Sequence, residues 1–160
     1  MKLHLDDLEK ISNNPDEPSF SNTIEIFDRS GYHFTRVNDL FINLCASNCI
    51  PELQSIELAL SGVLASHDNK IFTYPGKISA YIKLGMNFMI LGLFKRIESV
   101  YSTRNTENLN SEQLRLVERF YIDFVRAGAK FDTSTQERYA EITKELAELS
   151  TRFTQVINYY

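Results

Sequence analysis

The side chains best suited to bind a catalytic metal in this chain are its histidines and cysteines: His4, His33, His67, Cys45 and Cys49. A hydrolytic zinc site on a helix needs two histidines four residues apart, so that both imidazoles share one face beside a glutamate base. No histidine here has a second histidine at that spacing. The sequence therefore predicts no catalytic residue, no cofactor-binding residue and no metal ligand in this chain.

The two cysteines lie four residues apart within a helical pattern, which places both thiols on one face of a single helix. A disulfide between Cys45 and Cys49 would close a very short loop, and a metal would need further ligands from elsewhere. We expect two reduced, buried thiols, as is usual for cytoplasmic proteins. Residues 1–7 are acidic and lack the apolar core of a secretory signal, which also favours the cytoplasm.

Other arrangements that support catalysis are weak or missing. The six glycines form no phosphate-binding loop, and no Gly-x-Ser-x-Gly nucleophile elbow occurs. Four carboxylates alternate with basic residues on one predicted helix, as is typical of a solvated face: Glu137, Glu141, Glu145 and Glu148. Five aromatic side chains suit a peptide groove, although a buried core is the commoner role at helical spacing: Tyr74, Tyr81, Tyr101, Phe120 and Tyr121.

The composition of the 160 residues is that of a globular protein, with 43% hydrophobic and 24% charged residues. Lysine and arginine number 17 against 21 aspartates and glutamates, which gives a net charge of -4. Nucleic-acid binding needs a concentrated basic face. The charge balance therefore argues against a nucleic-acid partner.

The elements that must position these side chains are helices. Apolar residues recur at spacings of three and four, and the hairpin signals Asn-Gly and Asp-Gly are missing, so we predict an all-α chain. Helices are expected over residues 3–12, 22–47, 51–67, 111–127 and from about residue 133 onward. Gly31 falls inside the second helix, where it either admits a neighbouring helix closely or is tolerated at a cost of about 1 kcal/mol.

Several helix ends have recognisable signals. Asn110 and Gln113 have the spacing of a capping box, and Gly128 suits the left-handed residue that ends a helix. By the same criteria, the helix over 22–47 begins at Ser21 or Asn22, and the last helix begins near Thr133 or Ser134.

The last helix has the most regular apolar pattern of the chain. In steps of three, four, three, four and three, its stripe contains Tyr139, Ile142, Leu146, Leu149, Phe153 and Val156. A heptad stripe of this kind requires a partner helix. Within the chain, the candidate is the preceding helix, antiparallel across the turn at residues 129–132.

Residues 77–101 combine an apolar run with basic ends. The 11 residues 84–94 are apolar except for Asn87, and they fall well short of the roughly 20 needed to span a bilayer. Between residues 69 and 104 there are six basic residues and one acidic residue, Glu98. This pattern suits either an interfacial membrane helix over 77–95 or a buried helix with solvated ends, and the buried helix is favoured.

Four ordered blocks carry a family likeness: Asn-Pro-Asp-Glu-Pro-Ser-Phe-Ser-Asn-Thr-Ile at 14–24, the helix from Pro-Glu-Leu-Gln at 51–54 to Ala-Ser-His-Asp at 65–68, the segment 116–130 with Arg-Ala-Gly-Ala near its end, and Glu-Leu-Ala-Glu-Leu-Ser-Thr-Arg-Phe at 145–153. They resemble the thimet-oligopeptidase family of zinc metallopeptidases, most closely its bacterial peptidyl-dipeptidase and oligopeptidase A branch. That family consists of much larger, mostly helical enzymes with one zinc ion, which cleave short peptides inside a deep channel.

The resemblance implies that residues 1–160 form one helical region, the N-terminal segment of such an enzyme and part of its channel wall. The family's zinc ligands lie on a His-Glu-x-x-His helix and a downstream glutamate, and no position here matches them. At about residues 76–92 this chain has an insertion relative to the family, and the likeness stops after Gln155.

We therefore expect a truncated or split-gene part of a zinc peptidase that is inactive by itself. Short peptides would be the substrates of the full-length enzyme, and a complementary chain is an open alternative for the catalytic half. A different function class, a helical protein-interaction module pairing through exposed apolar stripes, is the main alternative. Membrane-surface binding through 77–95 is a weaker one.

Overall fold

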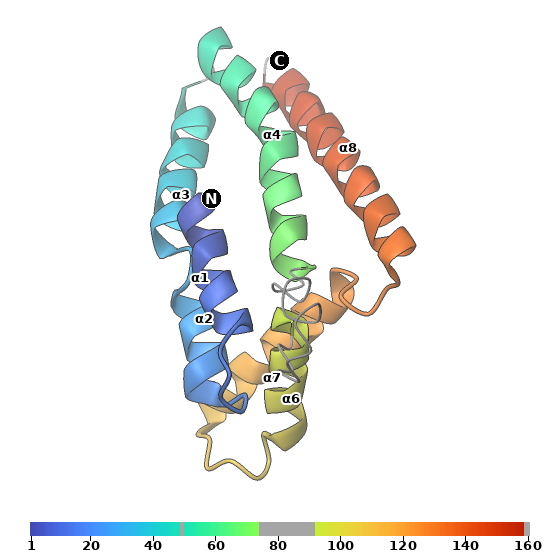
Figure 1. Ribbon diagram of the computed structural model, residues 1–160. Helices are drawn as coiled ribbons and strands as arrows, with labels where there is room; N and C mark the ends of the chain where they lie inside the picture. Colours follow the sequence, from blue (N-terminus) through green and yellow to red (C-terminus); the bar gives the residue numbers. More distant parts are fainter. Residues whose placement is uncertain (49, 74–91, 159–160) are drawn as a thin grey trace. The chain divides into compact units, whose positions relative to one another are not determined.

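The computed structural model describes residues 1–48, 50–73 and 92–158 (Figure 1). The predicted all-α class is confirmed, because these residues form helices and no strand. The elements in chain order are α1 (Lys2–Ser12), a π-helical turn η1 (Phe20–Ile24), α2 (Glu25–Arg29), α3 (Tyr32–Ser47), α4 (Pro51–Phe72), α6 (Leu93–Thr103), α7 (Ser111–Arg126) and α8 (Thr133–Asn158).

The helices fall into two compact units. The first unit comprises Met1–Gly31 and Ile71–Lys130, and the second comprises Tyr32–Lys70 and Phe131–Tyr160. The first unit therefore holds α1, η1, α2, α6 and α7, while α3, α8 and most of α4 belong to the second.

The core of the first unit forms where α6 and α7 pack against the N-terminal helices. On α6 the buried positions Leu93, Ile97 and Val100 follow the helical spacing of four and three, and α7 contributes Val117 and Phe124. Leu8, Ile11 and Ile24 complete this core from α1 and η1, and Ile71 from the end of α4. Phe124 is at its centre, with ring contacts to Phe27, Phe72 and Phe94.

The helix predicted over residues 22–47 is not continuous, and this prediction is wrong. The chain turns into η1 earlier, because Ser19 caps it: the Ser19 hydroxyl accepts a bond from the Asn22 backbone N–H at 3.3 Å, and the Asn22 side chain accepts one from Ser19 N–H at 2.9 Å. After α2, Ser30 is extended and Gly31 has a φ of 71°. A left-handed residue cannot continue a right-handed helix, so α3 begins anew at Tyr32.

The other helix boundaries agree with the predictions more closely. α4 runs to Phe72, about one turn beyond the predicted end, and Gly128 has the predicted left-handed backbone with a φ of 86°. The first turn of α8 is capped by Asp132 rather than by a residue of the helix, because its carboxylate accepts bonds from the Thr135 backbone N–H at 2.9 Å and the Ser134 hydroxyl at 2.7 Å. These bonds lower the pKa of Asp132 below its ordinary value.

The capping box predicted at the start of α7 is present. Asn110 Oδ1 accepts a bond from Gln113 N–H at 2.9 Å, and Gln113 Oε1 accepts one from Asn110 N–H at 3.0 Å. We expect Asn110→Ala to lower the free energy of unfolding by about 1 kcal/mol, because the Gln113 backbone N–H loses its side-chain acceptor. Urea denaturation followed by circular dichroism measures this change.

The matched control for this cap is Asn105→Ala. Asn105 is an exposed asparagine in the turn before α7, where a change of less than about 0.5 kcal/mol is expected. Equal losses in the two variants would show that the Asn110 cap contributes nothing specific.

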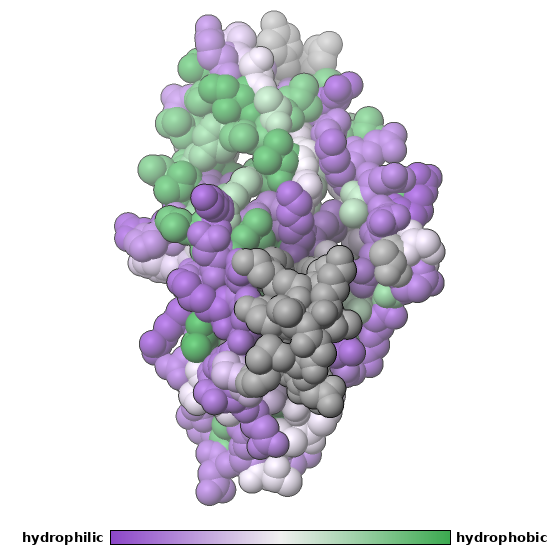
Figure 2. Space-filling model, in the orientation of Figure 1, coloured by the Kyte–Doolittle hydropathy of each residue, from purple (hydrophilic) through white to green (hydrophobic). Residues whose placement is uncertain are grey.

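The second unit has its polar contacts between α4 and α8. The Asn69 side chain donates to Thr143 Oγ1 at 2.6 Å, and the Gln155 amide donates to the Gln54 carbonyl at 2.8 Å and to Glu57 at 2.9 Å. Apolar side chains are meanwhile left at the surface of this unit. Figure 2 shows hydrophobic residues gathered over α3 and the first part of α4. The exposed apolar residues of these two helices include Leu40 and Ile56.

The heptad stripe of α8 is also exposed within the second unit. Its predicted partner, the preceding helix α7, belongs to the first unit, so that pairing stays a prediction. The stripe members Ile142, Leu146, Leu149, Phe153 and Val156 are 47% to 67% exposed, and we call these five residues the α8 stripe. Helix α8 packs instead through small and polar side chains, because these face α4.

Candidate functional site

The three histidines occupy three different local environments. His4 on α1 lies over Gly31, with its Nε2 3.4 Å from the Ser30 hydroxyl. His33 is exposed and has ring contact with Tyr32, whereas His67 is only 3% exposed and lies edge-on to Phe34 at 4.9 Å between centroids. Burial lowers the pKa of His4, which favours the neutral imidazole.

The residues described by the structure include no group of three histidine, cysteine, aspartate or glutamate side chains placed to hold a metal ion. They therefore do not fit a zinc site of the peptidase kind, which requires three protein ligands around the metal.

Cys45 on α3 is a free thiol that is partly covered. Burial raises its pKa, and the nearby carboxylate of Glu57 raises it further. Both effects disfavour the thiolate, which is the form that acts as a nucleophile or a metal ligand. Cys49 lies outside the described residues.

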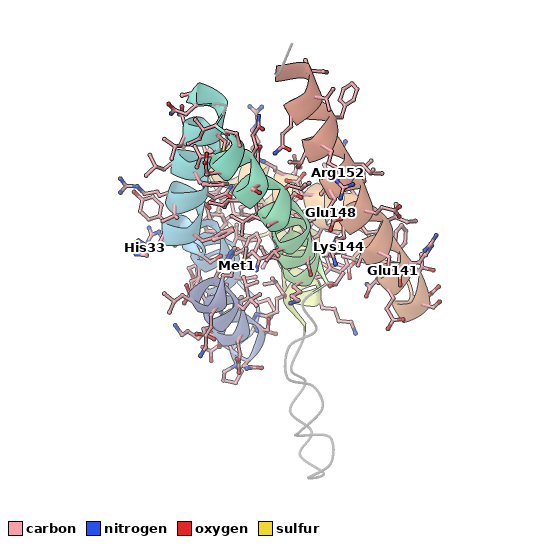
Figure 3. All side chains as sticks on the ribbon, turned by 90° about the horizontal axis from the view of Figure 1, so that it is seen from above. Met1, His33, Glu141, Lys144, Glu148 and Arg152 are labelled. Carbon is pink, nitrogen blue, oxygen red and sulfur yellow. The ribbon has the colours of Figure 1, made fainter. Side chains whose placement is uncertain are left out.

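The glutamates of α8 serve the helix surface. Glu141 forms an exposed ion pair with Arg138 at 2.9 Å, and Glu137 and Glu145 are also exposed. Glu148 and Lys144 lie on the side of α8 that faces α4, close to Gly62 (Figure 3). This placement agrees with the predicted solvated face at three of the four positions.

The most constrained polar group of the first unit is a buried arginine. Arg96 on α6 is 2% exposed, and its guanidinium donates to the Asn14 carbonyl at 2.8 Å, the Asp16 carbonyl at 3.1 Å and Asn22 Oδ1 at 3.0 Å. Burial lowers the pKa of Arg96, and Asp16 opposes that shift. The guanidinium therefore holds the Asn-Pro segment before η1 against α6.

Arg96 is not among the residues predicted from sequence, although a signal for it exists. It lies between Leu93, Ile97 and Val100 on the apolar side of α6. A charged residue at a position that the helical period assigns to the core must be paired or hydrogen-bonded. What the period does not reveal is the partner, which lies 74 to 82 residues away in the sequence.

The aromatic residues considered for a peptide groove are packed together instead. Tyr101 and Tyr121 are stacked with ring centroids 3.8 Å apart, and the Arg104 guanidinium covers Tyr101 at 3.9 Å. Lys130 closes the other edge, donating to the Tyr121 hydroxyl at 2.9 Å, and Phe120 makes an edge contact with Phe27. These residues contribute to the fold of the first unit, as the favoured interpretation predicts.

Two further predictions concern residues outside the described part of the chain. Tyr74 and Tyr81 are not described, and neither is most of the insertion at 76–92 or of the segment 77–95 considered for membrane-surface binding. Among the described residues, no helix is both long and apolar enough to cross a bilayer.

Comparison with known proteins gives a specific relationship. The chain is 30% identical over 149 residues to a dipeptidyl carboxypeptidase of Salmonella typhimurium and 32% identical over 145 residues to one of Escherichia coli. These matches cover 93% and 91% of this chain. The resemblance to the peptidyl-dipeptidase branch is thereby confirmed, whereas no family model matches the chain.

The match covers most of this chain but only a small part of each relative. It covers 20% of the Salmonella protein and 19% of the Escherichia protein, so the chain spans about a fifth of the curated relatives it matches. The similarity therefore concerns one part of a much larger polypeptide.

Proposed function

We propose that this chain corresponds to the N-terminal helical part of a zinc oligopeptidase of the dipeptidyl carboxypeptidase kind, and that it hydrolyses no peptide by itself. The observation that carries the proposal is a similarity over more than nine-tenths of the chain to about a fifth of two dipeptidyl carboxypeptidases. The 160 residues would form a single helical region of the enzyme, with an insertion at about 76–92, and would act in the cytoplasm.

The contacts of Arg96 support this relationship. They join the Asn-Pro segment at 14–24, the first of the family-like blocks, to the helix that begins at Leu93. The reacting groups would have to come from elsewhere, either from further residues of one longer polypeptide or from a complementary chain that binds the zinc.

The test is a combined measurement of zinc content and turnover on the purified chain. After dialysis against zinc we expect far less than one ion per chain, and no dipeptide released from a short peptide with a free carboxyl terminus. The Escherichia coli dipeptidyl carboxypeptidase is the positive control for the assay. One tightly bound zinc per chain together with turnover would overturn the proposal.

A second candidate function is that of a helical protein-interaction module, and the exposed α8 stripe favours it. Contiguous apolar surface that stays in water marks either an interaction site or a liability to aggregate. Size-exclusion chromatography with light scattering separates these outcomes. A discrete, soluble oligomer would favour the module, and polydisperse aggregates or partial unfolding would favour a part of a larger fold.

A further inference from the structure

The α8 stripe lies on the side of α8 that does not contact α4. Ala140, Thr143, Ala147 and Gln155 are partly buried, and two of them hydrogen-bond to α4. The stripe is on the opposite side, since it differs from these positions by nearly half a turn at 100° per residue. Within the second unit, α8 therefore packs its polar face and leaves its apolar face exposed among the described residues.

The charges beside the stripe restrict what that partner can be. Glu145 immediately precedes Leu146, and Arg152 immediately precedes Phe153, so both take the same flanking heptad position. Both side chains are exposed, and neither has an ion pair among the described residues. The other flank has no charge, because Ser150 and Ile157 occupy it.

The charges beside the α8 stripe can pair with those of a second α8 helix only when the two helices are antiparallel. In a parallel pair of α8 helices, Glu145 would face Ser150 of the partner subunit and Arg152 would face Ile157 of the partner subunit, which pairs no opposite charges. In an antiparallel pair, Glu145 would face Arg152 of the partner subunit, and the two-fold axis would create that ion pair twice. The same register places Leu146 against Leu149 of the partner subunit in the central layers.

We propose that a second copy of this chain covers the α8 stripe, forming an antiparallel two-helix interface flanked by reciprocal Glu145–Arg152 pairs. The apolar layers supply the attraction, and the flanking charges select the direction and the register. This proposal rests on the second candidate function, the interaction module, and names its partner. It does not depend on the peptidase relationship.

The test is sedimentation velocity of the whole chain from about 1 to about 100 μM, a range that brackets micromolar dissociation constants. We expect a dimer. Glu145→Arg and Arg152→Glu should each weaken it about tenfold, because symmetry converts two attractive pairs into two repulsive contacts. The double variant with both changes restores opposite charges and should return to within about threefold of the original affinity.

Glu141→Arg is the matched control. It makes the same change of charge on an exposed glutamate of α8 that lies away from the stripe, and it should leave the dimer unchanged. Circular dichroism of each variant checks that the helices remain folded. The double variant regains dimer affinity only if residues 145 and 152 pair across the interface. Unfolding of the variants would weaken the dimer in the double variant as well, so it cannot produce this recovery.

Three outcomes would overturn the proposal. A monomer over the whole concentration range would exclude self-association through the stripe. A discrete oligomer that is insensitive to both single reversals would keep the interaction-module function and exclude this antiparallel pairing. Polydisperse aggregates that persist in every variant would overturn the module and the pairing together.

Discussion

Replacing Arg96 by alanine is expected to lower the free energy of unfolding by about 3 to 4 kcal/mol. The side chain makes three hydrogen bonds to residues between Asn14 and Asn22, and each bond to a charged donor is worth roughly 1.5 to 3 kcal/mol when its loss leaves the acceptor unpaired. The acceptors are only partly buried, so water replaces part of the loss. That replacement limits the total.

Two further substitutions at this position separate the contributions. Arg96→Met keeps most of the packing of the side-chain stem and should lose about 2 to 3 kcal/mol, whereas Arg96→Lys keeps the charge but not the planar fork that reaches three acceptors. Urea denaturation measures all three variants. Because the Arg96 hydrogen bonds hold the Asn-Pro segment against α6, hydrogen exchange of the amides in η1 should accelerate as well.

Arg115→Met is the matched control for the loss of an arginine. Arg115 is exposed on α7 in the same unit, and its substitution should change the free energy of unfolding by less than about 0.5 kcal/mol. If Arg96→Ala lost no more than this control, the guanidinium contacts would not hold the segment in place.

Replacing Gly31 by alanine should lower the free energy of unfolding by about 2 kcal/mol. The left-handed backbone, with a φ of 71°, costs about 1 kcal/mol for a residue with a Cβ. That Cβ would also lie 2.6 to 2.8 Å from the imidazole of His4, which must then leave its position beside Ser30. The loss is measured by urea denaturation.

Gly62→Ala is the control for this substitution, because Gly62 has an ordinary helical backbone on α4. A Cβ there would meet the carboxylate of Glu148 and the end of Lys144, which are flexible side-chain ends that can move. Alanine is favoured over glycine in a helix by about 1 kcal/mol, so the net change should be close to zero or stabilising. A loss at Gly62 as large as at Gly31 would contradict the argument from backbone conformation.

The double variant Gly31→Ala with His4→Ala divides the effect at Gly31 into its two causes. Removing the imidazole relieves the close approach but leaves the backbone strain, so the second substitution should recover about half of the loss caused by the first. Full additivity of the two single losses would show that His4 and Gly31 are not coupled.

Much of the fold follows from local features of the sequence. The helical period, the missing hairpin signals, the Asn110–Gln113 box and the left-handed Gly128 are properties of a few neighbouring residues, and each of these was predictable. The likeness to dipeptidyl carboxypeptidases is also a property of the sequence alone, because it depends on ordered blocks of residue types. The absence of His-x-x-x-His spacing is read directly from the chain.

Tertiary structure decided the features that depend on distant contacts. The apolar period continues through Gly31 from Phe27 to Phe34, but the packing of His4 from α1 against Gly31 accompanies a break there. The position of Arg96 marked it as unusual, whereas its partners became known only from the fold. For α8 the heptad stripe correctly indicated an apolar face along the helix. Such a stripe does not specify which other element packs against that face. Helix α4 meets the polar face instead. The bond from Asn69 to Thr143 and the bond from Gln155 to Gln54 join residues that are distant in sequence, so they leave no periodic signal.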